Sequence, residues 1–218
     1  MDKRVDLYDV EALYAYIEGI AKQHNLKQTM TALPLMKELH KGQFRYGNDK
    51  KPYIIHPMMI ARQAVALGLL DDELVAAILL HDVLEDCDVK KEELPVSDEV
   101  KKIVELVSFF EKEGVSEAEA KAAYYQKIAG HKKASILKVL DRCNNVSTMG
   151  ETFPIARLCR YIEETQTYVY PLIEKILSDY PEYSDAAFLA QYQIESILRT
   201  LKRFLNNESD SAMDAGQR

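Results

Sequence analysis

The sequence is poor in several residues that mark special classes of protein. Its 218 residues include no tryptophan, three cysteines, eight glycines and seven prolines. The odd number of cysteines and the absence of a Cys-x-x-Cys spacing argue against a disulfide framework. Unpaired cysteines are typical of a reducing compartment, so we expect Cys87, Cys143 and Cys159 to be free thiols in a cytoplasmic protein.

Long apolar segments are also missing. The apolar run from Leu74 to Leu80 is interrupted by His81 and Asp82, and it is far shorter than the about 20 residues that a membrane-spanning helix needs. The N-terminal stretch MDKRVDLYDVEALYAY has neither the apolar segment nor the small-residue cleavage site of an export signal. We therefore expect no membrane contact and a cytoplasmic location.

Basic charge is in the minority. Lys and Arg number 28 against 35 Asp and Glu, which gives a formal net charge of −7 and a pI of about 5.3. Proteins that bind long nucleic acids usually carry basic stripes, so this balance argues against such a partner. A small anionic ligand is still compatible with a local basic pocket. Residues that could form one, or could simply be solvated surface residues, are Lys41, Lys50, Lys51 and Arg62.

Alternating strand patterns are scarce, whereas apolar residues recur at helical spacing. Val10, Leu13 and Ile17 step by three and four residues, which places them on one face of a helix. Similar spacing recurs within residues 74–81 and 136–143. The sequence thus predicts an all-α fold, a helical bundle without a significant β-sheet.

Two long helices are expected near the C-terminus, at residues 158–178 and 185–205. Pro171 must bend or split the first of them, because proline has no backbone N–H to donate and its ring crowds the preceding turn. No internal repeat or linker divides the chain, so residues 1–205 are predicted to form a single domain. The polar segment 206–218 is predicted to be a flexible tail.

The most informative segment is a run of ionisable residues directly after an apolar helix. The apolar residues 75–80 are followed by His81, Asp82, Glu85 and Asp86. Carboxylates at a helix C-terminus oppose the helix dipole, and like charges four residues apart repel each other. A bound divalent cation is the simplest feature that would offset both effects.

Two further residues could complete such a site. His56 precedes Pro57 at the expected start of a helix, and Asp141 lies where an apolar helical pattern gives way to polar residues. Two imidazoles and two carboxylates make a mixed nitrogen and oxygen site, which suits Mn²⁺, Fe²⁺ or Zn²⁺ with positions open for water. Taken alone, a His-Asp pair is more often an ordinary hydrogen-bonded pair, and an acidic run is more often a solvated helix end. The order and context of all four residues together favour metal ligation.

This order of histidines and aspartates resembles the HD phosphohydrolase superfamily, and longer blocks resemble the hydrolase domain of RelA/SpoT-type alarmone enzymes. The resemblance covers about residues 25–175 and rests on these segments: HKGQFR at 40–45, KPYIIHP at 51–57, LLHDVLED at 79–86, LDRCNN at 140–145, Glu164-Thr165 and Pro171-Leu172. The long enzymes continue beyond this region into a synthetase domain. The chain is therefore similar to a small alarmone hydrolase of the stringent response, with an HD-domain helical bundle.

The resemblance implies a chemistry and a set of roles. The implied reaction removes the 3′-diphosphate from guanosine tetra- or pentaphosphate, (p)ppGpp, and yields GDP or GTP plus pyrophosphate. It would depend on Mn²⁺ or another divalent transition metal. The family's metal ligands fall on His56, His81, Asp82 and Asp141. Its catalytic acidic pair falls on Glu85 and Asp86, and its nucleotide contacts fall on Arg45, Asn145 and Thr148.

Some nucleotide positions depart from the family pattern. Tyr46 stands where a basic residue is usual, and its ring could stack on a base in the nucleotide site. Ser147 stands where arginine is common. Since these positions have changed while the catalytic block is intact, the substrate could instead be an adenine alarmone, NADPH or a nucleoside monophosphate. A non-catalytic alarmone-binding protein is a further alternative, which the full set of ligand and acidic residues disfavours.

Overall fold

The computed structural model describes residues 6–45, 50–111 and 113–215, apart from the side chains of residues 151–152 and 206–215. These residues form helices joined by loops and turns, and the described part contains no strand beyond one isolated antiparallel bridge between Phe44 and Pro52. The prediction of an all-α fold is confirmed.

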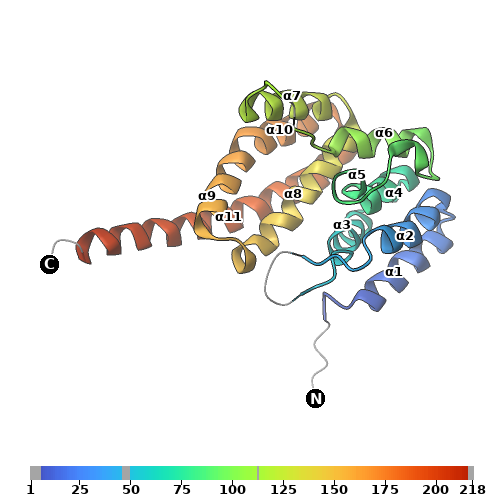
Figure 1. The fold of residues 1–218 in the computed structure, drawn as a ribbon, viewed down its shortest axis with the longest axis horizontal. Coiled ribbons are helices and arrows are strands. Elements are labelled where there is room, and N and C mark those ends of the chain that lie inside the picture. Colours follow the sequence, from blue (N-terminus) through green and yellow to red (C-terminus); the bar gives the residue numbers. More distant parts are fainter. Residues whose placement is uncertain (1–5, 46–49, 112, 216–218) are drawn as a thin grey trace, which may run out of the picture.

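The helices form two groups with one long helix between them (Figure 1). The first group comprises α1 (Val10–Gln23), α2 (Lys27–Leu39), α3 (Ile55–Ala66), α4 (Asp72–Leu80), α5 (Val83–Asp86) and α6 (Asp98–Val107). The second comprises α7 (Glu117–Ala129), α9 (Ile155–Glu164), α10 (Tyr170–Asp179) and α11 (Ser184–Ala215). Helix α8 (Lys132–Thr152) packs against both groups, so its residues face the space where the groups meet.

Local sequence explains where several helices begin. Asp9, Asp71, Ser97 and Ser116 precede α1, α4, α6 and α7, and each side chain accepts a hydrogen bond from a backbone N–H in the first turn. Helix α4 has a different character, because every residue from 74 to 80 is buried. It therefore runs through the core and brings the residues that follow it to the centre of the molecule.

The predicted helix at 158–178 is divided, as Pro171 required. Helix α9 ends at Glu164, a π-helical segment spans Thr165–Val169, and α10 begins at Tyr170 with Pro171 in its first turn. Proline leaves the carbonyl four residues earlier without its usual donor, and that carbonyl lies in the π segment. The wider turn of the π segment accommodates this missing hydrogen bond, so α10 follows α9 without an intervening loop.

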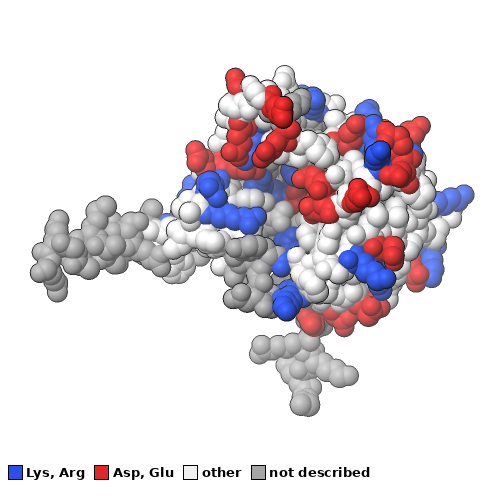
Figure 2. All heavy atoms as spheres, viewed as in Figure 1, with Lys and Arg blue, Asp and Glu red and all other residues white. Residues whose placement is uncertain are grey.

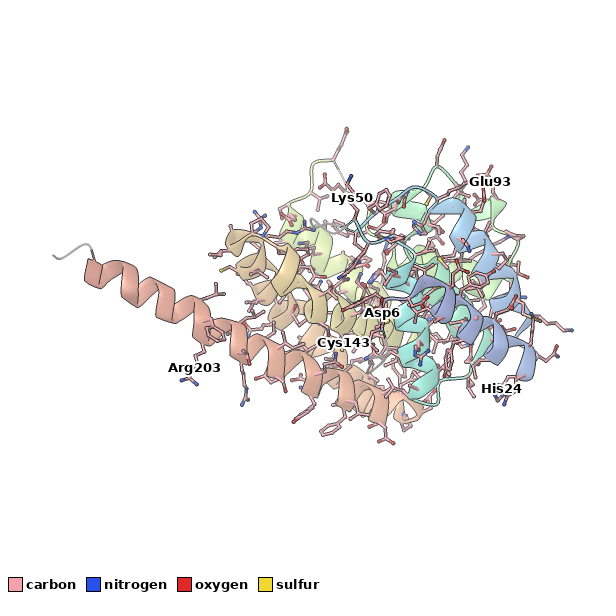
Figure 3. All side chains as sticks on the ribbon, turned by 90° about the horizontal axis from the view of Figure 1, so that it is seen from below. Asp6, His24, Lys50, Glu93, Cys143 and Arg203 are labelled. Atoms are coloured by element: carbon pink, nitrogen blue, oxygen red, sulfur yellow. The ribbon has the colours of Figure 1, made fainter. Side chains whose placement is uncertain are left out.

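Helix α11 begins within one residue of the prediction and is longer than expected. It packs along α8, and its backbone stays helical from residue 206 to Ala215, beyond the expected end at 205. Figure 3 shows Arg203 pointing away from the body, whereas Cys143 lies inside it. The domain boundary at residue 205 and the flexibility of the tail stay predictions.

Two sequence expectations concern the chain as a whole. The three cysteines are free thiols, with Cys143 buried and Cys159 exposed. Among the described residues, no helix combines the length and the apolar character that crossing a bilayer requires.

Candidate active site

Three separate stretches of chain meet at the predicted metal site. His56 lies in the first turn of α3, and Asp141 lies in the middle of α8. His81 ends α4 and Asp82 precedes α5, so a tight change of direction presents both side chains at one point. Because α3, α4 and α8 pack against one another, the four residues come together.

The ligand atoms of these residues are close to one another. The Nε2 atom of His56 lies 3.1 Å from Asp141 Oδ1 and 3.7 Å from Asp82 Oδ2. The Nε2 atom of His81 lies 3.0 Å from Asp82 Oδ2 and 3.7 Å from Asp141 Oδ1. Both imidazoles are 2% exposed, so solvent water has little access to their ring nitrogens.

The outer nitrogen of each imidazole has a fixed partner. His81 Nδ1 lies 2.8 Å from the carbonyl oxygen of Ile78, and His56 Nδ1 lies 2.8 Å from Asn144 Oδ1. A carbonyl oxygen only accepts, so Nδ1 donates and the Nε2 atom of each ring faces the carboxylates. His81 Nε2 is buried and makes no hydrogen bond in the described structure. A cation among these atoms would satisfy that nitrogen and both carboxylates.

Distances and protonation both fit a divalent metal ion. Metal bonds of about 2.0–2.2 Å to nitrogen and oxygen place neighbouring ligands about 3 Å apart, close to the separations observed here. Burial lowers the pKa of His56, which keeps its ring neutral and able to coordinate. Burial alone would also lower the pKa of His81, but the carboxylates of Asp82 and Asp141 outweigh it and raise that pKa to about 10. Without a metal, a proton on His81 therefore takes the place of the cation.

The predicted acidic pair lies on α5, next to this site. The backbone N–H of Phe109 donates to Glu85 Oε1 at 2.9 Å. Desolvation by the surrounding protein raises the pKa of Glu85 to about 7, although the side chain still reaches solvent. A carboxyl with this pKa can exchange a proton at neutral pH.

The described residues predicted to contact nucleotide also lie together. Arg45 Nη2 donates to Asn145 Oδ1 at 3.1 Å and to Thr148 Oγ1 at 3.3 Å. Asn145 in turn donates to Asp141 Oδ1 at 2.6 Å, which connects this group to the metal site. The predicted residue Tyr46 lies outside the described residues.

A cavity of about 570 Å³ opens beside the metal site and includes His56, Arg45, Asn145 and Thr148 in its wall. Its other cationic and aromatic residues are Lys51, Arg62, Arg157, Tyr8, Tyr53, Phe153 and Tyr161. In Figure 2 the surface is hollowed between α9 and α5, with Lys and Arg side chains on the α9 side and Asp and Glu on the other. An acidic protein thus has a local basic cavity, in which anionic and planar groups can both be held.

Sequence reasoning missed several side chains that support the site. The Tyr53 hydroxyl donates to Asp82 Oδ2, and Lys138 Nζ lies 3.0 Å from Asp141 Oδ2. Tyr53 lies inside one of the family-like blocks, but nothing in a linear sequence indicates which carboxylate its hydroxyl meets.

Glu164 and Thr165, which form one of the family-like segments, both contact the buried residue Arg142. Arg142 is 3% exposed, and its guanidinium donates to Glu164 and to the hydroxyls of Thr165 and Tyr125. Its charged plane also lies 3.9 Å from the centre of the Tyr161 ring. These contacts join α9 and the π segment to α8, directly behind Asp141.

Comparison with known protein families gives one match that covers most of the chain. A model described as the HD domain matches residues 32–165. That range contains every residue assigned above to the metal site, the acidic pair and the nucleotide contacts.

Individual relatives have consistent names. A guanosine-3′,5′-bis(diphosphate) 3′-pyrophosphohydrolase of Vibrio cholerae is 31% identical over 75% of this chain and 24% of its own length. One of the same name from Aquifex aeolicus is 32% identical over 78% of this chain and 25% of its own length. The bifunctional (p)ppGpp synthase/hydrolase SpoT of Escherichia coli is 29% identical over 78% of this chain and 25% of its own length. The chain thus spans about a quarter of the length of these relatives.

A solved structure shares the fold. It is described as a metazoan ortholog of SpoT that hydrolyzes ppGpp and plays a role in starvation responses. It aligns with 80% of this chain and 95% of its own, at a TM-score of 0.62 and 19% identity.

Proposed function

The chain belongs to the HD domain family, and from that premise we propose that it is a metal-dependent hydrolase that removes the 3′-diphosphate from (p)ppGpp. The products are GDP or GTP and pyrophosphate. The observation that carries this proposal is the convergence of two imidazoles and two carboxylates beside a basic cavity. The names of the relatives, which are (p)ppGpp 3′-pyrophosphohydrolases, supply the substrate.

The proposed ligands of the metal are His56, His81, Asp82 and Asp141. Mixed imidazole and carboxylate ligands suit Mn²⁺, which is the metal we propose. When bound, a divalent ion would lower the pKa of a coordinated water towards about 7 and polarise phosphoryl oxygens. Tyr53 donates to Asp82 Oδ2, the oxygen that also faces the two imidazoles, whereas Lys138 contacts Asp141 Oδ2, the oxygen turned away from them.

Glu85 is the proposed proton acceptor for the attacking water. Its pKa of about 7 allows it to take a proton at neutral pH and return it to the 3′ oxygen that leaves. Asp86, the next residue on α5, is proposed to orient the same water. The phosphorus attacked is the one bonded to the 3′ oxygen, because breaking the bond between these two atoms releases pyrophosphate as one unit.

The basic cavity is the proposed binding site of the nucleotide. Arg45 has a planar guanidinium that stacks on a purine or binds a phosphate with two N–H groups. Asn145 and Thr148 hold Arg45 in the cavity wall and add polar groups of their own. The location proposed for this reaction is the cytoplasm, where free thiols are stable.

A product assay tests the proposal. Purified protein with Mn²⁺ is expected to release pyrophosphate from ppGpp with little orthophosphate, and a chelator is expected to stop the reaction. Asp82→Ala should remove turnover while the circular dichroism stays helical. A folded, Mn²⁺-loaded protein that leaves ppGpp intact would contradict the proposal.

A second candidate substrate is an adenine alarmone or NADPH. The observation in its favour is Ser147, which lines the cavity where the family commonly has arginine and accepts a hydrogen bond from Gln193 at 2.7 Å. Ser147 and Gln193 are both neutral, so this part of the cavity lacks the cation with which an arginine could recognise one particular base. A substrate panel measured by kcat/KM separates the candidates, and calorimetry that finds tight binding without product would instead favour a non-catalytic binding protein.

A further inference from the structure

Lys138 is a mostly buried cation beside the proposed metal ligand Asp141. It lies on α8, three residues before Asp141, and its side chain is 16% exposed. Its Nζ atom lies 3.0 Å from Asp141 Oδ2. Burial of an ammonium group is costly unless the group is paired, and here the carboxylate of Asp141 is the partner that offsets this cost.

The two oxygens of Asp141 have different partners. Oδ1 lies 3.1 Å from His56 Nε2 and accepts from Asn145, whereas Oδ2 faces Lys138. Oδ1 is therefore the oxygen turned toward the other ligand atoms. We propose that Lys138 is a positioning residue, which fixes the Asp141 carboxylate so that Oδ1 is presented to the metal ion.

The surroundings of Lys138 fix the ammonium group in turn. Its Nζ atom lies 5.7 Å from the centre of the Tyr124 ring, a distance at which an aromatic face attracts a cation. Tyr124 is anchored by a hydrogen bond from its hydroxyl to the carbonyl of Val107, and its ring packs edge-on against Phe109. Phe109 is also the residue whose N–H holds Glu85. Lys138 therefore contacts the Tyr124 ring, and Glu85 is held by the backbone of Phe109, the residue whose ring packs against Tyr124.

The neighbouring cation on α8 does not duplicate this contact. Arg142 directs its guanidinium to Glu164, Thr165 and Tyr125. Lys138 also acts on Glu85, because its charge opposes the rise in the pKa of that carboxyl. Loss of the ammonium group would therefore affect both the metal ligand and the proposed proton acceptor.

The inference rests on the proposed function for its catalytic consequence but not for its binding test. Binding of Mn²⁺ to the full chain without nucleotide is measured by calorimetry for the wild type, Lys138→Met and Lys138→Arg. Residues that orient metal ligands typically change metal affinity by about 10–100-fold when removed. We expect that loss for Lys138→Met, and affinity closer to the wild type for Lys138→Arg, which keeps a charged donor.

Lys133→Met is the matched control. Lys133 lies on the same helix, is 13% exposed and pairs with Asp71 and Glu73 at 2.8 Å each, away from the metal site. Its loss should lower stability and leave the Mn²⁺ affinity unchanged. An equal loss of affinity in Lys133→Met and Lys138→Met would overturn the proposal, as would folded Lys138→Met that binds Mn²⁺ like the wild type.

A second variant of Lys138 and an assay of (p)ppGpp hydrolysis separate the role of Lys138 from a failure to fold and from the proposed function. If Lys138→Met does not fold, Lys138→Gln is read in the same way, because it keeps an N–H donor and loses the charge. A wild type that binds Mn²⁺ but does not hydrolyse (p)ppGpp would contradict the proposed function and leave the affinity comparison valid. A wild type that hydrolyses (p)ppGpp beside a Lys138→Met variant of unchanged Mn²⁺ affinity would contradict only the role of Lys138.

Discussion

Arg45 and Asn145 form a hydrogen bond of 3.1 Å across 100 residues of sequence. Asn145 uses its other amide atom to donate to Asp141 Oδ1 at 2.6 Å. One amide side chain therefore joins the wall of the nucleotide cavity to the proposed metal site.

Replacing Arg45 should weaken substrate binding more than it slows chemistry. Hydrogen bonds to charged groups contribute about 1.5–3 kcal/mol, which corresponds to a rise in KM of about 10–100-fold for Arg45→Ala. Because the metal ligands are untouched, kcat should fall less than KM rises. Steady-state kinetics on ppGpp measures both, and an unchanged KM would argue that Arg45 does not contact the nucleotide.

Mn²⁺ should stabilise the folded protein through His81. At a metal concentration 100 times the Kd, binding adds about 2.7 kcal/mol to the free energy of unfolding, or about 5–10 °C in Tm for a chain of this size. His81→Ala should abolish that shift, and a chelator should reverse it in the wild type. The exposed His24 at the end of α1 supplies the control, since His24→Ala should keep the full shift. A normal Mn²⁺ shift in His81→Ala would contradict the site.

Metal binding should release a proton. The pKa of His81 is raised to about 10, so without metal its ring is protonated at pH 7, and coordination requires that proton to leave. Apparent Mn²⁺ affinity should therefore rise as pH increases from 6 to 8. Calorimetry in buffers of different ionisation enthalpy should report about one proton released per ion. Binding enthalpies that are equal in all buffers would show that His81 is already neutral.

Glu85 should control the acidic limb of the pH profile. Its pKa is raised to about 7, so the carboxyl is protonated below that pH and ionised above it. A proton acceptor works in the ionised form, and kcat should therefore rise with pH, with a midpoint near or somewhat below pH 7 since a bound cation lowers this pKa, and level off above that midpoint. Glu85→Gln should lower kcat and remove this limb. If the limb persists in Glu85→Gln, the titrating group is another one, such as metal-bound water.

Breaking the pair of Arg142 with Glu164 should destabilise the protein strongly. Removing one partner of a buried pair leaves the other charge uncompensated, which costs about 3–5 kcal/mol. Glu164 is partly exposed and also pairs with Lys121, so Glu164→Ala is expected at the lower end of this range. Chemical denaturation measures the change, and the exposed neighbour Glu163 provides the control as Glu163→Ala. Equal stability of both variants would contradict the prediction.

Much of the site could be predicted because its residues are neighbours on helices. His81, Asp82 and Glu85 lie within two turns, and an acidic run after an apolar helix is unfavourable without a cation. The order His56, His81-Asp82, Asp141 then matched a family pattern. The contact of Tyr53 with Asp82 could not be found in this way, because it joins residues 29 positions apart whose approach depends on helix packing. Lys138 lies three residues before Asp141 on α8, so helical spacing allows their contact, but spacing alone does not show which oxygen of Asp141 the ammonium group meets.

The sequence by itself determined the helical class and the division near Pro171, and it supplied the residues proposed to bind a cation. These follow from local properties, namely side-chain periodicity, the missing N–H of proline and the chemistry of imidazole and carboxylate. Only the tertiary structure decided which oxygen of Asp141 faces His56, which face of the site is basic, and that Tyr53 contacts Asp82. Those features arise between residues far apart in the chain, and their geometry is set by the packing of whole helices.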